Sequence, residues 1–354
     1  MTIWSILLLI AKCLAAPPSY LIPITEESNG NSLSVKVYTS GAEWYETSVY
    51  LTLRNSVSWL ASDYCYTANC LTMTAPRYLD TGSVSSQAPE QVLGRSVSDS
   101  VITGSSVVDT FNFGTWATPN YTDVTVNRID AMRVTGFGDN RLPGVIGLGP
   151  GNVEGLRLTP IVSSGGFSQF SMILYAAYNF LILGEQNSPP GVNFRAALLI
   201  SGLPLYKQDD TWNYQITNFG TNTGSSMFFG GTGMAVLSTD QSIMQIPKAM
   251  GSAMAAQLGA TVVSGAVDTY NVNCSATPTL GSIIFSTPSG NLTLTGWQIA
   301  YSGVGTCNLK VVGKDEMRHG LPVWTLGIDF LRCFNILYDA TQPCLSFYVP
   351  DTPA

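Results

Sequence analysis

Short runs in which apolar and polar residues alternate dominate this chain. In residues 45–53, YETSVYLTL, every second side chain from Tyr45 to Leu53 shares one face of an extended chain, because successive side chains of a strand point to opposite sides. Gly, Pro, Asn and Ser separate further runs of this kind, at residues 106–114, 170–184, 212–219, 281–297 and 334–349. Such punctuation is typical of strands joined by turns, so the sequence predicts a mostly β fold.

Helices are the exception in this pattern. Residues 248–259, KAMGSAMAAQLG, are rich in the good helix formers Ala and Met and end at Gly259, which predicts a helix that stops there. A second, short helix is expected after Gly327.

Composition limits the function classes. The chain has 354 residues, 45% hydrophobic and 11% charged, which suits either one large domain or two lobes. The net charge is -7 and no basic cluster could neutralise a run of phosphates, so no nucleic-acid partner is expected. A single histidine, His319, gives little support to a Ser-His or Cys-His mechanism, and no glycine-rich phosphate loop stands out, so no cofactor is expected.

The N-terminus predicts export. Residues 1–15, MTIWSILLLIAKCLA, form a short apolar stretch that ends in small residues, which is typical of a signal peptide cleaved after Ala15. The alternative, a membrane anchor, needs about 20 apolar residues, and Lys12 interrupts a shorter run. We expect a secreted protein with no membrane span after cleavage.

Cysteine usage agrees with an oxidising compartment. Six cysteines remain once Cys13 leaves with the signal peptide, which allows three disulfides. The chain has no Cys-x-x-Cys pair and one histidine, so no zinc or other metal site is expected. Three Asn-x-Ser/Thr triplets make glycosylation candidates of Asn120, Asn273 and Asn291.

An internal echo suggests duplication. A β-branched residue, an aliphatic residue and a glycine occur at residues 145–147 and again at 325–327. Each glycine follows a polar turn at a similar distance, 147 − 52 = 95 residues after Thr52 and 327 − 231 = 96 residues after Gly231. A two-lobe architecture fits this spacing.

The order and spacing of several motifs resemble the pepsin-like aspartic protease family over nearly all of the mature chain. The motifs are SVSWLAS with the cysteines after it, DTFNFG, PGVIGLG, FSMIL, LILG, WNYQI, GTGMAVLS and WTLGIDFLRCFNILYD. The resemblance implies a bilobal fold of two similar β-rich lobes with a cleft between them and a few short helices. It divides the chain into a signal peptide (1–15), a short segment without a basic prosegment (16–34), an N-terminal lobe (35–200) and a C-terminal lobe (201–354).

The same resemblance implies disulfide pairs. Cys65 with Cys70 and Cys274 with Cys307 match the pairs of the family in position and spacing. Cys333 and Cys344 are then left as a third pair that flanks the last hairpin.

Catalysis in this family needs two aspartates, one in each lobe, that share a proton and activate a water between them. Aligned on Trp59, the first aspartate position falls on Thr52, with Leu53 and Arg54 where Thr and Gly belong. The second falls on Gly231. Neither residue can serve as the acid or the base, because a threonine hydroxyl does not ionise in the working range and glycine has no side chain.

Other acids near these positions are candidate substitutes. Residues 47–62 and 211–239 contain no Asp or Glu, which leaves Asp63 and Asp240 as the nearby carboxylates. Asp80 stands in a literal Asp-Thr-Gly-Ser, but that motif lies beyond the first disulfide loop and no tryptophan follows it at the spacing of Trp59. We interpret Asp80 as a loop residue. The family's flap tyrosine is also missing, and Val97 stands near its position.

Three functions therefore remain open. Because both aspartate positions are substituted, we do not expect this chain to have the proteolytic activity of the family. The first is a secreted, non-catalytic aspartic protease homologue that binds a peptide, a glycan or a protein such as a partner enzyme, in the cleft or on surface loops. The second is an active aspartic-type endopeptidase that uses an unrecognised acid pair. The third is a structural or adhesive surface protein. The sequence does not indicate an oligomeric state.

Overall fold

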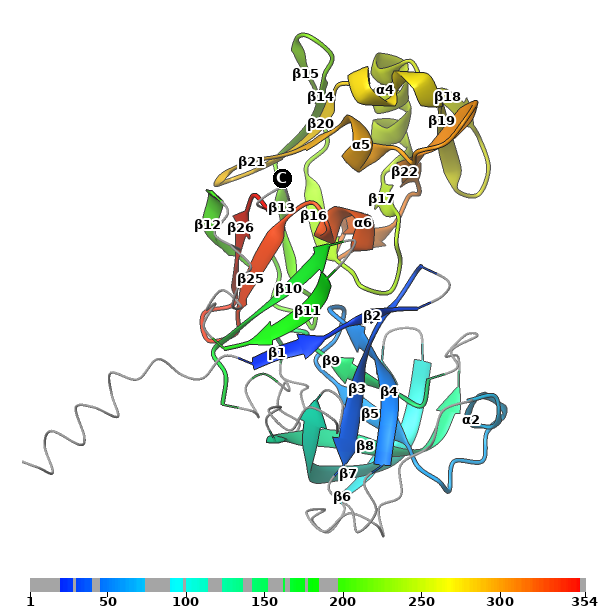
Figure 1. Ribbon diagram of the computed structural model, residues 1–354, viewed down its shortest axis with the longest axis vertical. Helices are drawn as coiled ribbons and strands as arrows, with labels where there is room; N and C mark the ends of the chain where they lie inside the picture. The colour runs from blue at the N-terminus through cyan, green and yellow to red at the C-terminus, as the bar shows by residue number, and fades with distance from the viewer. Residues whose placement is uncertain are drawn as a thin grey trace, which may run out of the picture.

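The computed structural model is built mainly of strands, with a few short helices (Figure 1). It describes residues 20–27, 30–39, 45–73, 90–97, 100–113, 123–135, 142–151, 162, 166–175, 178–184 and 197–350. Within these ranges, no helix has the length and apolar character needed to cross a membrane. The signal peptide, Asp80 and Asn120 lie outside the described residues.

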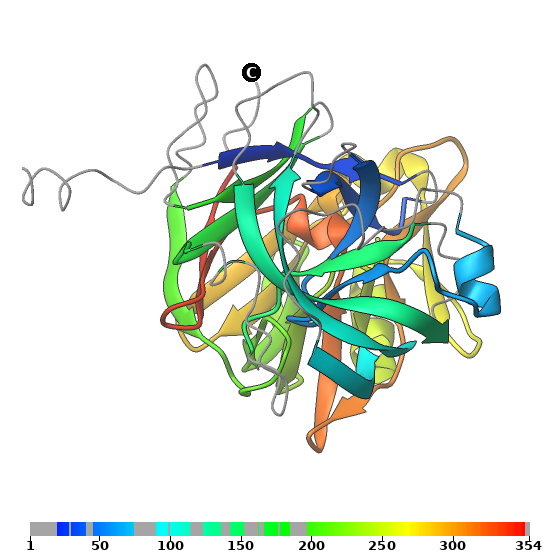
Figure 2. The same ribbon diagram turned by 90° about the horizontal axis from the view of Figure 1, so that it is seen from below.

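The first half of the chain forms a sheet that closes on itself. Its strand order is β2-β3-β4-β9-β5-β8-β7-β6, and β3 also pairs with β7, so six strands make a ring. Figure 2 shows the long strands of this sheet from below, with the short helix α2 (Ala68–Leu71) at its periphery. The strands are β2 (Thr25–Glu26), β3 (Leu33–Thr39), β4 (Tyr45–Thr52), β5 (Ser58–Ala61), β6 (Glu90–Val97), β7 (Ser100–Phe113), β8 (Asp123–Thr135) and β9 (Gly144–Gly147).

The second half contains two sheets. The larger has the order β13-β16-β24-β17-β22-β19-β18, with β23 paired to β24, and the smaller has the order β15-β14-β20-β21. Their strands are β13 (Asn213–Ile216), β14 (Asn218–Asn222), β15 (Ser226–Gly230), β16 (Gly233–Leu237), β17 (Met244–Ile246), β18 (Thr261–Val263), β19 (Asp268–Asn273), β20 (Ser282–Thr287), β21 (Gly290–Thr295), β22 (Thr306–Gly313), β23 (Met317–Arg318) and β24 (Leu321–Leu326).

A six-stranded sheet joins the two halves. Its order is β1-β11-β10-β25-β26-β12, and Figure 1 shows it between the first half below and the second half above. The expected division of the lobes at residues 200/201 falls inside β12, so this sheet belongs to both halves. The strands are β1 (Tyr20–Pro23), β10 (Gln169–Tyr175), β11 (Tyr178–Leu183), β12 (Leu198–Pro204), β25 (Asn335–Asp339) and β26 (Cys344–Tyr348).

The expected helices are present. Helix α4 (Lys248–Leu258) ends at Gly259, whose φ of 66° is the left-handed conformation that glycine adopts without strain. Helix α6 (Ile328–Leu331) follows Gly327 directly. Two further helical turns among the described residues are η2 (Cys274–Thr279) and α5 (Gly296–Ile299).

Burial follows the alternation of the sequence. In β4, Thr47 and Val49 are buried, whereas Glu46 and Ser48 on the opposite face are partly exposed. Near the end of this strand, at residues 49–52, side chains on both faces are buried, and β9 pairs with residues 50–52. One large apolar cluster runs from β3 and β4 through the six-stranded sheet into the second half, and a smaller one surrounds Trp59 and the first disulfide. The buried ends of strands thus meet where the two halves meet.

Candidate functional site at the junction of the two halves

Two loops meet at this junction, and each begins at the end of a strand in a parallel pair. Strand β4 pairs in parallel with β9, and the Leu148 amide donates to the Thr52 carbonyl at 2.8 Å. Strand β16 pairs in parallel with β24, and the Ser238 amide donates to the Leu326 carbonyl at 3.0 Å. The two glycine-ended runs noted in the sequence, residues 145–147 and 325–327, therefore flank the two loops.

Thr239 locks one loop to the other. Its hydroxyl donates to the Leu51 carbonyl at 2.8 Å and accepts from the Leu53 amide at 3.2 Å. Thr239 and Leu53 are buried, where hydrogen bonds are electrostatically stronger than in water. A single side chain from the second half thus fixes the backbone on both sides of Thr52.

The hydroxyls of Thr52 and Ser238 occupy matching places in the two loops. The Arg54 amide donates to the Thr52 hydroxyl at 3.1 Å, and the Asp240 amide donates to the Ser238 hydroxyl at 3.2 Å. In both loops, a hydroxyl closes a turn with the amide two residues ahead. Both side chains are buried. The two halves therefore present the same turn to each other, with a hydroxyl at the first position of each.

Among the described residues, Asp240 is the carboxylate that contacts Thr52. The Thr52 hydroxyl donates to Asp240 Oδ2 at 3.2 Å, and Asp240 is exposed. Asp63, the other acid weighed from the sequence, lies instead in the exposed turn between β5 and the first disulfide. The Thr52 and Ser238 hydroxyls at the junction do not ionise below strongly alkaline pH, and the Asp240 carboxylate accepts from the first of them.

Gly231 does not lie opposite Thr52, which corrects the expectation for the second half. Ser238 follows Gly231 by 238 − 231 = 7 positions that include strand β16, which places the two on the order of 20 Å apart at the usual rise of a strand. A Cβ at Gly231 would meet Met250 and Trp324, so this glycine, with φ 97°, packs against α4 and β24. Thr239 and Asp240, which follow Ser238, contact the first loop.

A signal for these residues is present in the sequence. Ser238 stands 327 − 238 = 89 residues before Gly327, close to the 95 residues in the first half. It also follows directly on β16, a strand that is buried throughout. The sequence motif places the second aspartate position at Gly231 instead, because Thr232 and Gly233 match two residues of the family motif.

Trp212 supports both loops from one buried position. Its indole Nε1 donates to the Leu148 carbonyl at 2.7 Å, and its own carbonyl accepts from the Leu237 amide at 2.9 Å. Leu148 follows the strand that flanks the first loop, and Leu237 ends the strand before the second. The side chain is fully buried, so this residue connects the halves directly behind the site.

Asp329 holds the second loop from behind. Its backbone amide donates to the Ser242 carbonyl, and its Oδ2 accepts from the Ser242 hydroxyl at 3.1 Å and from the Tyr301 hydroxyl at 3.0 Å. Arg332 and Lys310 supply positive charge at 3.5 and 3.9 Å from Oδ1. Burial and the negative charge of Asp329 raise the pKa of Tyr301 to about 12. Asp329 is therefore a buried anchor of the second loop.

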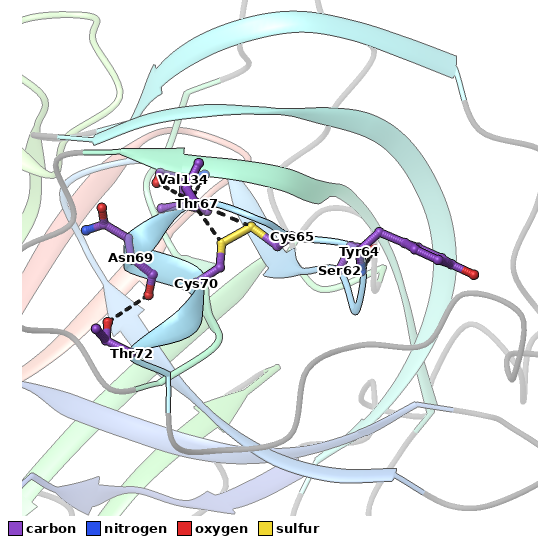
Figure 3. Close-up of a disulfide and its surroundings, with 8 residues drawn as sticks. All are labelled: Ser62, Tyr64, Cys65, Thr67, Asn69, Cys70, Thr72 and Val134. Atoms are coloured by element: carbon purple, nitrogen blue, oxygen red, sulfur yellow. Dashed lines mark hydrogen bonds between the residues drawn. A yellow bond between two sulfur atoms is a disulfide. The ribbon is translucent and has the colours of Figure 1, made fainter.

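Two of the three expected disulfides are confirmed. Cys65 bonds to Cys70 and Cys274 bonds to Cys307. Figure 3 shows the first of them with Thr67, whose hydroxyl donates to the Val134 carbonyl at 2.8 Å and so ties the disulfide loop to β8.

The third expected disulfide is wrong, since Cys333 and Cys344 are free. In the last hairpin Cys344 pairs with Asp339 next to the turn, while Cys333 precedes the open end at Asn335. About five residues of extended strand separate the two ends, far beyond the reach of an S–S bond. The buried Cys333 thiol donates to the Asp329 carbonyl instead.

The structure describes some of the other residues that the sequence analysis names. Asn273 and Asn291 are exposed, and Asn273 Oδ1 accepts from the Ser275 amide and hydroxyl. Val97 ends strand β6, but its side chain lies outside what the structure describes. His319 contacts Asp209 at 3.2 Å in an exposed turn.

Comparison with known proteins agrees with this geometry. The family model described as eukaryotic aspartyl protease matches residues 48–348. The chain is 28% identical over 225 residues to renin from Canis lupus familiaris, which covers 58% of this chain and 53% of that protein. It is 32% identical over 118 residues to renin from Ovis aries, which covers 32% of this chain and 29% of that protein. The chain thus spans about half or less of the length of these relatives.

The matched residues include both loops of the junction and both disulfides. The fold, with its mostly β halves joined by a shared sheet, is that of a bilobal pepsin-like protein. The chain belongs to the eukaryotic aspartyl protease family.

Proposed function

We propose that this protein is a secreted, non-catalytic member of the family that binds a peptide, a glycan or a protein partner, such as another enzyme, between its halves or on its surface loops. One observation carries the proposal. The two matched turns at the junction present the hydroxyls of Thr52 and Ser238, where hydrolysis by this family needs two carboxylates. We assign these two residues to the family's aspartate positions.

The chemistry explains why the exchange removes activity. One carboxylate of the pair takes a proton from the attacking water while the other donates one to the substrate carbonyl. Two close carboxylates achieve this because they cannot both ionise and therefore share a proton. Hydroxyl groups at both positions provide neither the base nor a titrating acid.

Asp240 favours one alternative, an active endopeptidase with an unusual acid. Its Oδ2 lies 3.2 Å from the Thr52 hydroxyl, within reach of a water held at the junction. A single carboxylate could act as a base on that water, but the acid would have to come from a second group. The proposal therefore treats Asp240 as a loop residue that binds Thr52.

A cleavage assay on the mature chain separates these two functions. We expect no peptide cleavage between pH 2 and 7 by the native chain, and no change in Asp240→Ala. Cleavage by the native chain that pepstatin inhibits and Asp240→Ala abolishes would overturn the proposal in favour of the alternative.

Reconstitution tests the assignment of the two positions. The minimum change expected to allow hydrolysis is Thr52→Asp with Ser238→Asp, while each single change stays inactive. Because Arg54 and Asp240 stand where the family has glycine, the turns are rebuilt in a second variant that adds Leu53→Thr, Arg54→Gly and Asp240→Gly. The matched control is Thr52→Asp with Gly231→Asp, which stays inactive because Gly231 lies far from Thr52. Activity in the control but in neither Ser238→Asp variant contradicts the assignment.

Binding is tested separately from activity. Random octapeptides retained by the native chain in equilibrium dialysis are identified by mass spectrometry. We expect Thr52→Arg, which places a large side chain at the junction, to abolish retention, and Val304→Arg, at a fully exposed position, to leave it unchanged. Equal retention by both variants would place the binding site away from the junction.

A further inference from the structure

A surface pocket of about 260 Å³ lies beside the edge strand β21, far along the chain from the two loops. Its lining includes Asn291, Thr293, Trp297, Leu199 and Val349. Trp297 is 65% exposed, and Leu199 and Val349 are each 41% exposed. A cluster of exposed large apolar side chains is unusual on a soluble protein and indicates that something covers it.

A glycosylation motif lies in the lining of the pocket. Asn291, Leu292 and Thr293 form one of the Asn-x-Thr triplets of the sequence. Because side chains alternate along β21, Asn291 and Thr293 point outward while Leu292 and Leu294 are fully buried. Within the described part of the chain, no hydrogen bond engages the Asn291 side chain, whereas Asn273 Oδ1 is occupied by Ser275.

Trp297 offers an exposed aromatic face on which a sugar ring can stack. It lies in the short helix α5, which follows β21 directly and is fixed by a capping box between Thr295 and Gln298. The backbone that carries the exposed indole is therefore fixed, and Trp297 and Asn291 line the same pocket. The pocket is smaller than the roughly 300–1,000 Å³ of sites for drug-sized ligands, and its mixture of an aromatic face with amide and hydroxyl groups suits one sugar ring.

We propose that Asn291 carries an N-linked glycan whose first sugar packs on Trp297 and covers the apolar pocket. In the transfer, Asn291 Nδ2 bonds to C1 of an oligosaccharide supplied on a polyprenyl diphosphate. The C1–oxygen bond breaks, the diphosphate leaves with the electron pair, and the amide proton passes to the transferase. The proposal rests on the secretion part of the proposed function and is independent of whether the junction is catalytic.

The test uses the full chain secreted by a eukaryotic host. Enzymatic removal of N-glycans in H₂¹⁸O marks each occupied asparagine as a labelled aspartate, read by peptide mass spectrometry. We expect Asn291 to be occupied and Thr293→Ala to lose the label there while Asn291 remains. An unlabelled Asn291 overturns the proposal, and so does retention of the chain inside the cell.

Packing on Trp297 is read from the rate of glycan removal under native conditions. We expect release from Asn291 to be about tenfold slower than from the same protein after unfolding, because the sugar must first leave the ring. Trp297→Ala should remove most of this protection, whereas Val304→Ala, a matched exposed position, should not. Equal release rates in the native, unfolded and Trp297→Ala proteins would contradict the packing. Peptide cleavage measured on the same preparation reports separately on the proposed function.

Discussion

At the scale of single residues, two tyrosines with similarly raised pKa values differ in what their hydroxyls contact. The Tyr301 hydroxyl donates to the buried carboxylate of Asp329 at 3.0 Å. The Tyr270 hydroxyl is buried without a hydrogen-bond partner among the described residues. Burial raises the pKa of each to about 12, and nearby aspartates add to the effect.

These contacts predict opposite outcomes for the two phenylalanine variants at neutral pH. Tyr301→Phe leaves a buried charged acceptor with one donor fewer, so we expect the free energy of unfolding to fall by about 1.5–3 kcal/mol. Tyr270→Phe removes an unpaired hydroxyl, so we expect a change of less than about 1 kcal/mol. Urea unfolding at pH 7 measures both. Equal losses would show that the hydroxyl of Tyr270 has a partner.

The same tyrosines predict a loss of stability in alkali. A pKa that folding raises from the ordinary 10 to about 12 means that the folded state binds the proton more tightly. The stabilisation is complete below pH 10 and is lost as pH rises from 10 towards 12. Each phenylalanine variant should show a shallower decline of the urea midpoint across this window than the native chain.

At the scale of elements, the two disulfides close loops of very different length. Cys65 and Cys70 are 5 residues apart, whereas Cys274 and Cys307 are 33 apart. The entropy that a disulfide removes from the unfolded chain grows with the loop, which gives about 2 kcal/mol for the short loop and about 4 kcal/mol for the long one. Replacing each pair with alanine and measuring unfolding by guanidinium tests this order. A larger loss at the short loop would show that native packing around Thr67, not chain entropy, dominates.

The sequence predicted single strands and helices better than it predicted contacts between them. Strand β4 and helix α4 were predictable because alternation and composition act locally, and Gly259 marks the end of the helix in the sequence itself. The pairing of Cys333 with Cys344 was not predictable from spacing alone. Which end of a hairpin a thiol occupies depends on strand register, and register is a property of the folded sheet.

The sequence predicted one of the two positions of the candidate site. Thr52 could be placed because Trp59 and the cysteines follow it at family spacing. Ser238 was missed because Gly231 and its neighbours match more letters of the motif. The contact that identifies the second loop, Thr239 with Leu51 and Leu53, joins residues about 190 positions apart, and no local pattern records it.

At the scale of the whole molecule, Trp212 couples the halves through one indole. Trp212→Phe leaves the buried Leu148 carbonyl without its donor at 2.7 Å, so we expect a loss of about 2 kcal/mol or more in the free energy of unfolding. Trp297→Phe is the matched control, since its side chain is 65% exposed, and should change stability by less than about 0.5 kcal/mol. Calorimetry should show one transition shifted as a unit. Separate transitions for the two halves in the native chain would contradict the coupling.

The parallel pairs that flank the two loops also set an order of events during synthesis. The first half can close its sheet once Gly147 has left the ribosome, but its loop at Leu53 must wait for Thr239, and the second loop must wait for Leu326. The interval is 326 − 147 = 179 residues, or about 9–36 s at roughly 5–20 residues per second. We expect the nascent first half to stand complete but uncovered for that time, so that chaperones meet the face around Thr52 before the second half does.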